Sequence, residues 1–421
     1  MGTENRPAAI GPVHTTWARP AHTALPVTWA LTRAAMLLLL ALDETFPLGV
    51  GGVAREVHQL YARWAATLAQ GTFPVGDPLW QYPPGAGPVL LAPDLLPGLT
   101  YFQGFVAMTL AADALVTYAL VRGDRDPRGA WLWTAGLPLL LHIPLARYDV
   151  EVTALAVLAL LTLHRAPRAA GGLAALGALV KVWPALVLLG VERGRTARQA
   201  WGAALGAAAA MLLVLTLAFR APFSFLREQG GRGVQIESLG GTVLAGARML
   251  GRPGRVRYRY GAMEFLGPQV GVVATASLAL TAVAFGVLLW WRVRARRYSA
   301  ATPYDAALCA VLMFTVTSRV ISPQYLVWLL GLGAVCLTSR QTTQRPVALL
   351  VLAAAGVSAL AYPVLYADVT GGTGTGLAVM VVRNALLLAA AVLSFRRLWA
   401  ATAAKERESP LTGQSTQTTN I

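Results

Sequence analysis

The stretch PQVGVVATASLALTAVAFGVLLWW (residues 268–291) decides the fold class of this chain. It carries no charged side chain and exceeds the ~20 apolar residues that a helix needs to cross the hydrocarbon core of a bilayer. Four arginines follow it at once: Arg292, Arg294, Arg296 and Arg297. Arginine and lysine gather on the cytoplasmic side of membrane proteins. The stretch is therefore interpreted as a transmembrane helix that ends inside the cell.

Similar apolar runs recur along the whole chain of 421 residues. The composition is 56% apolar and only 13% charged, which is too little charge to cover the surface of a soluble domain of this size. We therefore predict an all-α integral membrane protein, a polytopic helical bundle with about ten spans. The expected spans are residues 26–47, 99–121, 131–146, 149–164, 200–219, 268–291, 304–319, 325–338, 347–366 and 377–395.

The formal net charge is +16, and Lys181 and Lys405 are the only lysines. Such a charge can indicate nucleic-acid binding. Here the arginines form short clusters between apolar runs, which favours the positive-inside pattern and contact with anionic membrane lipid. We therefore expect membrane lipid as a partner and no nucleic acid.

The arginine clusters predict the topology. Arg19 and Arg33 place the N-terminus inside, and the clusters at 122–128, 193–198 and 292–297 mark further inner loops. Two large loops, 48–98 and 220–267, are then outside. We expect a cytoplasmic N-terminal segment (1–25), a transmembrane catalytic domain (26–398) and a disordered cytoplasmic tail (399–421), which is polar and rich in Thr, Ser and Gln.

Residues 170–192 do not fit a simple alternation of spans. A single span would place Arg193, Arg195 and Arg198 outside, and Pro184 would interrupt the helix. We prefer a helical hairpin that dips into the membrane and returns, with Lys181 at its tip. Lys181 stands amid apolar neighbours. It is either a snorkelling lysine or a cation that needs an anion.

The first outer loop resembles a helix rather than a simple connector. Residues 54–70 place Val57, Leu60, Tyr61, Trp64 and Leu68 on one side at helical spacing, and we expect this face to lie on the outer membrane surface. Glu56 falls in the first turn, where the helix dipole favours an ionised carboxylate. This suits a general base, although the carboxylate could merely cap the helix.

A second surface helix is expected within WQYPPGAGPVLLAPDLLP (80–97). Asp77, just before it, is either a turn residue or a ligand for a sugar hydroxyl.

Several later charges also fall at the expected outer ends of spans. Arg147 and Asp149 stand where two spans meet, and could form a structural ion pair or a functional site. The stretch RGVQIESL (232–239) combines a cation, an amide and an acid in Arg232, Gln235 and Glu237. Arg319 and Gln324 lie at or near SPQYLVWL (322–329). Since the arginine fork matches phosphate, the converging cations indicate a phosphate group on the outer side.

These motifs, in this order, resemble glycosyltransferase family 87, bacterial membrane mannosyltransferases of the GT-C fold that use polyprenyl-phosphate-mannose. The order is an acid before a surface helix, then YPP (82–84), RYD (147–149), a lysine followed by a proline, RGVQIES, SPQYLVW and RN (383–384). The resemblance covers roughly residues 28–395. RGVQIESL and SPQYLVWL are its more specific motifs.

The resemblance implies a GT-C-type bundle in the bacterial plasma membrane with an outward-facing active site. An acid in the first outer loop would be the base that deprotonates the acceptor. That role falls on Glu56, where the family usually has aspartate, and His58 is a second candidate. Tyr82, Asp77 and the outer polar residues named above become candidate substrate ligands. The expected partners are a polyprenyl-phosphate sugar and a glycolipid or glycan acceptor.

We expect inversion at the sugar, no cofactor and no metal. Mannose is the family's usual sugar, and a pentose is an open alternative. A transporter or flippase for a polyprenyl-linked or other anionic substrate is the alternative function, since it too would place cations in a membrane cavity.

Overall fold

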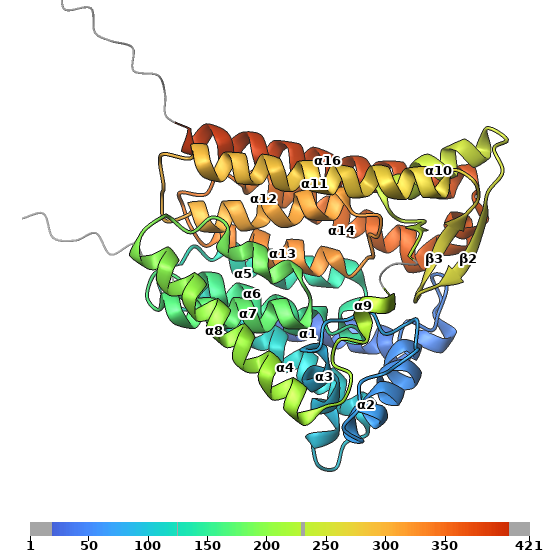
Figure 1. Cartoon of the computed structure of the whole chain (residues 1–421), viewed down its shortest axis with the longest axis horizontal. Helices are drawn as coiled ribbons and strands as arrows, with labels where there is room; N and C mark the ends of the chain where they lie inside the picture. Colours follow the sequence, from blue (N-terminus) through green and yellow to red (C-terminus); the bar gives the residue numbers. More distant parts are fainter. Residues whose placement is uncertain (1–18, 124, 229–231, 404–421) are drawn as a thin grey trace, which may run out of the picture.

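Figure 1 shows a computed structural model of the chain, a layered bundle of helices with a small β-sheet at one end. The structure describes residues 19–123, 125–228 and 232–403. Most of the predicted N-terminal segment (1–25) and tail (399–421) therefore lies outside the described residues. Where these segments are described, helix α1 begins at Arg19 and helix α16 ends at Thr402. Residues 19–25 and 399–402 are thus helical, so residues 399–402 are not part of a disordered tail; the division into domains stays a prediction.

Six helices are long and apolar enough to cross a membrane, within the described part of the chain. Their outward surfaces are largely apolar and exposed, as a lipid-facing helix requires. A multi-pass helical membrane protein is therefore the fold class. These helices are α1 (Arg19–Ala41), α4 (Tyr101–Val121), α8 (Arg195–Ala218), α11 (Val270–Arg294), α14 (Arg345–Ala359) with its π-helical continuation η7 (Leu360–Val364), and α16 (Gly374–Thr402).

Shorter helices lie among the six, and they alter the predicted count of ten spans. They are α5 (Arg128–Gly136), α6 (Asp149–Thr162), α7 (Pro167–Val180), α12 (Thr302–Thr317) and α13 (Tyr325–Leu337). The expected span 131–146 breaks after α5 into two 3₁₀ turns, η4 (Leu137–Leu140) and η5 (Ile143–Ala146), each with a proline in its first turn. Ten full spans are thus not confirmed. Helices α12 and α13 are almost wholly buried and therefore contact protein instead of lipid.

The arginine-rich loops gather at one end of this bundle. Arg193 Nη2 donates to the carbonyl of Arg292 at 2.9 Å, and the ring of His164 bonds to the carbonyl of Ala300 at 3.1 Å. The Asp126 amide likewise donates to the carbonyl of Thr338. The loops that the sequence assigned to the inner face are therefore neighbours in space, and we call this the basic end. Its orientation toward the cytoplasm stays a prediction.

Arg33 is an exception to the charge-based topology. It lies within α1 and is 2% exposed, with its Nε 2.7 Å from the carboxylate of Asp113 on α4. Trp29 and Trp133 also donate to that carboxylate. The prediction that Arg33 marks the inner face is therefore wrong. A buried arginine can stay charged inside the bundle only because a partner neutralises it and accepts its hydrogen bonds.

Helix α7 and the segment after it form a hairpin. The α-helix ends at Val180, and the backbone of Lys181 is extended. The chain then returns along α7 through the 3₁₀ helix η6 (Trp183–Leu188). Because Arg193 is at the basic end, Lys181 lies at the opposite end of the bundle, which we call the site end.

Short elements cover the site end. From the first large loop come η1 (Asp43–Thr45), the π-helix η2 (Glu56–Tyr61), α2 (Ala62–Ala69), α3 (Ala86–Leu91) and η3 (Ala92–Leu95). From the second come α9 (Phe225–Glu228), β1 (Val234–Gln235), α10 (Leu239–Met249), β2 (Arg255–Arg259) and β3 (Ala262–Leu266), and α15 (Tyr366–Gly371) follows η7. The strands form an antiparallel sheet in the order β1-β3-β2, in which Gln235 pairs with Glu264.

The helical face of η2 and α2 contacts protein, not the membrane surface. Tyr61, Trp64 and Leu68 are each 1% exposed. The Trp64 ring meets Trp80 edge-on at 5.1 Å between centroids, and the Tyr61 ring lies 5.7 Å from that of Phe105 on α4. The helical spacing of these residues is confirmed, but the apolar face is covered by the bundle and not by lipid.

Candidate functional site

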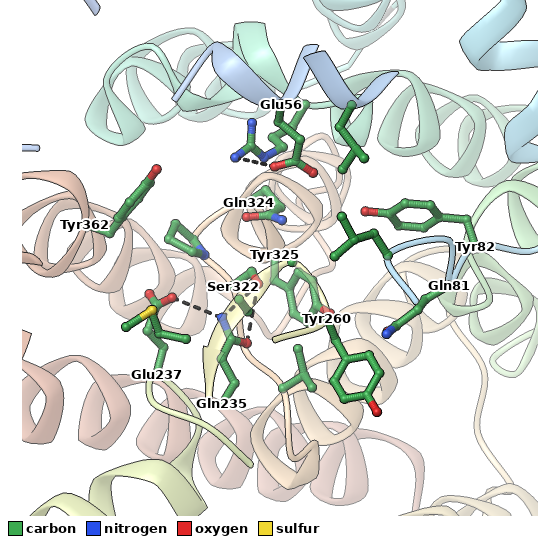
Figure 2. Close-up of a pocket in the computed structure, with 18 of the residues that line it drawn as sticks. Glu56, Gln81, Tyr82, Gln235, Glu237, Tyr260, Ser322, Gln324, Tyr325 and Tyr362 are labelled. Atoms are coloured by element: carbon green, nitrogen blue, oxygen red, sulfur yellow. Dashed lines mark hydrogen bonds and ion pairs between the residues drawn. The ribbon is translucent and has the colours of Figure 1, made fainter. Parts of the chain in front are cut away.

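A cavity of about 780 Å³ opens at the site end of the bundle. Its walls come from both large loops, the hairpin tip, the ends of α12 and α13, and η7 with the start of α15. Figure 2 shows polar side chains converging on it from these elements. Nine of the twelve predicted site residues line it: Glu56, Tyr82, Arg147, Lys181, Arg232, Gln235, Glu237, Arg319 and Gln324.

Glu56 faces the cavity as an ion pair with Arg147. The carboxylate oxygen Oε2 lies 2.7 Å from the guanidinium, and Glu56 is 24% exposed at its side chain. Arg147 also donates to the carbonyl of Val53, three residues before Glu56. The guanidinium therefore fixes both the carboxylate and the loop that carries it.

Asp43 supports the same loop from behind, a role that the sequence reasoning missed. Its carboxylate accepts the amides of Val53 and Ala54 at 3.0 and 2.8 Å, and it lies 2.8 Å from the ring of His142. Asp43 is 2% exposed. The sequence does contain a sign of this role, because Asp43 directly follows the first apolar run. An ionisable side chain at the end of a membrane span is energetically costly and usually functional.

Lys181 is paired with Asp149, which supplies the anion that the lysine needs and corrects one other interpretation. Its ammonium lies 2.6 Å from Asp149 Oδ1, and Trp328 donates to the same oxygen. Lys181 is thus a cation whose anion comes from within the chain, from Asp149. Arg147 and Asp149 do not pair with each other, because each meets a partner from elsewhere in the chain. The ammonium also lies 4.5 Å from the ring centroid of Tyr148, which adds cation–π attraction.

Glu237 is the second acid in the cavity wall, held by the last helix. The carbonyl of Glu237 accepts from Arg383 at 2.6 Å and from Asn384 at 3.3 Å, both on α16. Its Oε2 accepts from Gln235, which also bonds to Ser322. Its Oε1 is buried without a hydrogen-bond partner in the described chain. Burial raises the pKa of Glu237 to about 7, against the opposing charge of Arg383.

Arg232 joins the two large loops at the cavity. It donates to Gln81 Oε1 at 2.6 Å and lies 3.5 Å from the carboxylate of Glu264 on β3. Burial raises the pKa of Glu264 above its usual range, although the amide of Gly233 and the charge of Arg232 oppose this. Gln81 precedes Tyr82 of the YPP motif; both residues line the cavity, but only Tyr82 was predicted.

Three predicted residues do not line the cavity. Asp77 accepts from the Trp64 indole at 2.8 Å and from the amide of Leu79 at 2.9 Å, so the simpler interpretation, a turn residue, describes its contacts. His58 is exposed and stacks on Phe102 at 3.9 Å. Asp149 is fully buried, and its carboxylate pairs with Lys181, which does line the cavity.

Several cavity residues were not predicted at all. Tyr258, Tyr260, Tyr325 and Tyr362 bring aromatic rings to the walls, and Figure 2 shows three of them around the space below Glu56. Tyr325 lies within the SPQYLVWL motif, which could have identified it as a site residue. Tyr258 lies in β2, and Tyr260 lies in the turn between β2 and β3. The position of both over the cavity depends on the register of β2 with β3.

One flank of the cavity is apolar. Val182, Trp183 and Phe314 line it beside Lys181, and Val182 is 65% exposed. In a membrane-embedded bundle an exposed apolar flank beside a polar cavity suits a ligand with both a charged and a hydrocarbon part.

No group of three or more His, Cys, Asp or Glu side chains is placed to hold a metal ion among the residues that the structure describes. The prediction that no metal takes part is not tested by this observation and stays a prediction.

The bundle and its cavity define a multi-pass membrane protein with a polar, partly enclosed site at one end. The family model of glycosyltransferase family 87 matches residues 80–323, more than half of the chain. The chain therefore belongs to glycosyltransferase family 87, and its activity is that of a glycosyltransferase. The matched segment contains Arg147, Lys181 and RGVQIESL, whereas Glu56 precedes it. Comparisons with curated proteins and with solved structures find no significant match.

Proposed function

We propose that this glycosyltransferase transfers a sugar, mannose by the family's usual preference, from polyprenyl phosphate to a hydroxyl of a glycolipid or glycan acceptor. The site would face the outer side of the bacterial plasma membrane, within a GT-C-type bundle. The observation that carries the proposal is that one cavity presents a carboxylate, Glu56, together with the cations Arg147, Lys181 and Arg232.

The cations suit the leaving group of this reaction. When the bond between the anomeric carbon and the phosphate oxygen breaks, the electron pair stays on the polyprenyl phosphate. Preorganised guanidinium and ammonium groups stabilise charge that grows in the transition state. Arg232 is held by Gln81 and Glu264, and Lys181 by Asp149, so neither must reorganise when that charge develops.

Glu56 suits the base. It would take the proton of the acceptor hydroxyl as that oxygen bonds to the anomeric carbon on the face opposite the phosphate. One displacement with one base inverts the anomeric centre, and no covalent sugar–enzyme intermediate is required. The ion pair with Arg147 holds the Glu56 carboxylate in a fixed place in the cavity wall, as a general base requires.

The apolar flank suits the lipid part of the donor. Val182 and Trp183 continue from Lys181 at the hairpin tip, and Phe314 of α12 also lines the cavity. A polyprenyl chain could lie along this flank while its phosphate reaches the cations. No specific observation favours the transporter or flippase interpretation over this one.

The direct test is transfer by purified protein supplied with polyprenyl-phosphate mannose, the corresponding arabinose donor and a nucleotide-sugar, each with a panel of glycolipid acceptors. We expect transfer from a polyprenyl-phosphate sugar, unchanged by a chelator. Transfer from the nucleotide-sugar alone would overturn the donor assignment, and loss of transfer with the chelator would overturn the metal prediction.

A further inference from the structure

A second cavity, of about 340 Å³, lies at the basic end, opposite to the candidate active site. It is a groove between the beginnings of α7 and α8. Arg168 of α7 forms one side, and Arg195, Arg198 and Gln199 of α8 form the other. We call it the arginine groove.

The cations of the arginine groove lack the neutralisation that those of the active-site cavity have. In that cavity Arg147, Lys181 and Arg232 each lie within 4 Å of a carboxylate. In the groove, no carboxylate within the described chain forms an ion pair with Arg168, Arg195 or Arg198, and all three are exposed. Three like charges lining so small a volume repel one another, so an anion in the groove would be strongly attracted.

The groove is built on a rigid frame. Helices α7 and α8 pack closely at its base, where a Cβ on Gly171 would lie only 2.0 Å from the carbonyl oxygen of Ala200. Farther along α8, a Cβ on Gly202 would meet nothing within 4 Å, so the groove stays open beside the helix. Neither helix has an acid in its first turn, and both positive helix ends add to the arginine charge.

The surroundings of the groove indicate a lipid. Helix α8 is only 17% buried over its apolar window, and its exposed side chains include Trp201 and Leu205, one and two turns beyond Arg198. Tryptophan is typical of the membrane–water interface. A molecule whose phosphate lay in the groove would thus have its acyl chains alongside the lipid-facing surface of α8.

We propose that the arginine groove binds the phosphate headgroup of an anionic phospholipid. Arginine pairs with phosphate through two parallel hydrogen bonds, and basic pockets between helices on the inner face of a membrane suit such headgroups. The site is separate from the glycosyltransferase site, so it does not depend on the donor or acceptor proposed above.

The test compares the full-length protein with the triple variant R168Q/R195Q/R198Q in detergent, by the thermal unfolding midpoint as dioleoylphosphatidylglycerol is added. A ligand that binds only the folded state raises this midpoint in a concentration-dependent way. We expect phosphatidylglycerol to raise the midpoint of the parent, and the triple variant to need at least roughly tenfold more of the lipid for the same shift. Dioleoylphosphatidylcholine should give neither protein a comparable shift.

The matched control is R294Q/R296Q/R297Q, which removes the same charge from three exposed arginines at the same end, outside the groove. It should respond to phosphatidylglycerol as the parent does. Equal loss in both triple variants would show general surface attraction and overturn the proposal. An equal shift of the parent by inorganic phosphate at the same concentration would overturn the lipid assignment.

If the groove triple variant does not fold, the single variant Arg198→Gln takes its place. It must weaken the response to phosphatidylglycerol several-fold, and an unchanged response would overturn the proposal.

Discussion

At the scale of single residues, the partner of each charge decides what that charge can do. Glu56 and Glu237 both face one cavity, but their surroundings differ. Glu56 meets a guanidinium at 2.7 Å. The Arg383 guanidinium donates a hydrogen bond to the backbone carbonyl of Glu237, whereas it lies 3.9 Å from the Glu237 carboxylate. The sequence identified both acids, yet it could not show these pairings, because the partners lie tens to more than a hundred residues away in the chain.

Glu237 gives the site a dependence on pH. Since burial raises its pKa to about 7, the side chain is mostly protonated below that pH and ionised above it. If the carboxylate accepts a hydrogen bond from a sugar hydroxyl, kcat/KM should rise as the pH passes upward through about 7, because kcat/KM reports groups of the free enzyme. In Glu237→Gln this step should vanish. The measurement is kcat/KM from pH 5.5 to 8.5.

Glu44→Gln is the control for that profile, because Glu44 is an exposed acid outside the cavity that pairs with Arg55. It should keep the parent profile. A step near pH 7 that persists in Glu237→Gln would assign the titration to another group.

At the scale of elements, the spacing of apolar residues predicted where helices form, but not whether lipid or protein covers their apolar faces. Residues 99–121 were predicted as a span and form α4 at Tyr101–Val121. Residues 131–146 were predicted in the same way, but prolines divide them into α5 and two short turns. The face of η2 and α2 was assigned to the membrane surface and packs on the bundle instead. A sequence gives the period of an apolar face, whereas only the tertiary contacts show what covers it.

The α7–α8 contact offers a sharp test of packing. A Cβ on Gly171 would press on the backbone of α8, whereas one on the adjacent Gly172 would meet nothing within 4 Å. Gly171→Ala should therefore destabilise the protein by about 1–3 kcal/mol. Gly172→Ala should be neutral or stabilise it by up to about 1 kcal/mol, because alanine favours a helix over glycine. Thermal unfolding midpoints in detergent decide this, and equal midpoints for the two variants would contradict the close packing.

At the scale of the whole molecule, charge clusters predicted which loops are neighbours. The inner-loop arginines meet at the basic end, and Glu56 shares the site end with RGVQIESL. Arg33 and Asp113 are the counterexample, since a charge buried within the bundle resembles a loop charge in the sequence. The strand register that brings Tyr258 to the cavity could not be predicted, because it depends on pairing within a loop without long apolar runs.

The orientation of the two ends can be measured with single cysteines and an impermeant thiol reagent, after Cys309 and Cys336 are replaced by alanine. We expect cysteines at Val75 and Arg257, exposed at the site end, to react on intact cells. Cysteines at Glu192 and Arg297, exposed at the basic end, should react only after permeabilisation. Reaction of positions 75 and 257 from opposite sides would contradict a shared outer cavity. Reaction of position 192 from outside would contradict the hairpin as a re-entrant element.

The central claim is that Glu56 is the base of a glycosyl transfer in this cavity, and one substitution tests it most directly. Glu56→Gln keeps the size of the side chain and a hydrogen-bond acceptor for Arg147, but removes the basic carboxylate. The account predicts that kcat falls by roughly 10²- to 10⁴-fold while donor affinity and the unfolding midpoint stay near those of the parent. Glu56→Asp, which keeps the carboxylate, should remain active. A kcat for Glu56→Gln within a few-fold of the parent would contradict the account.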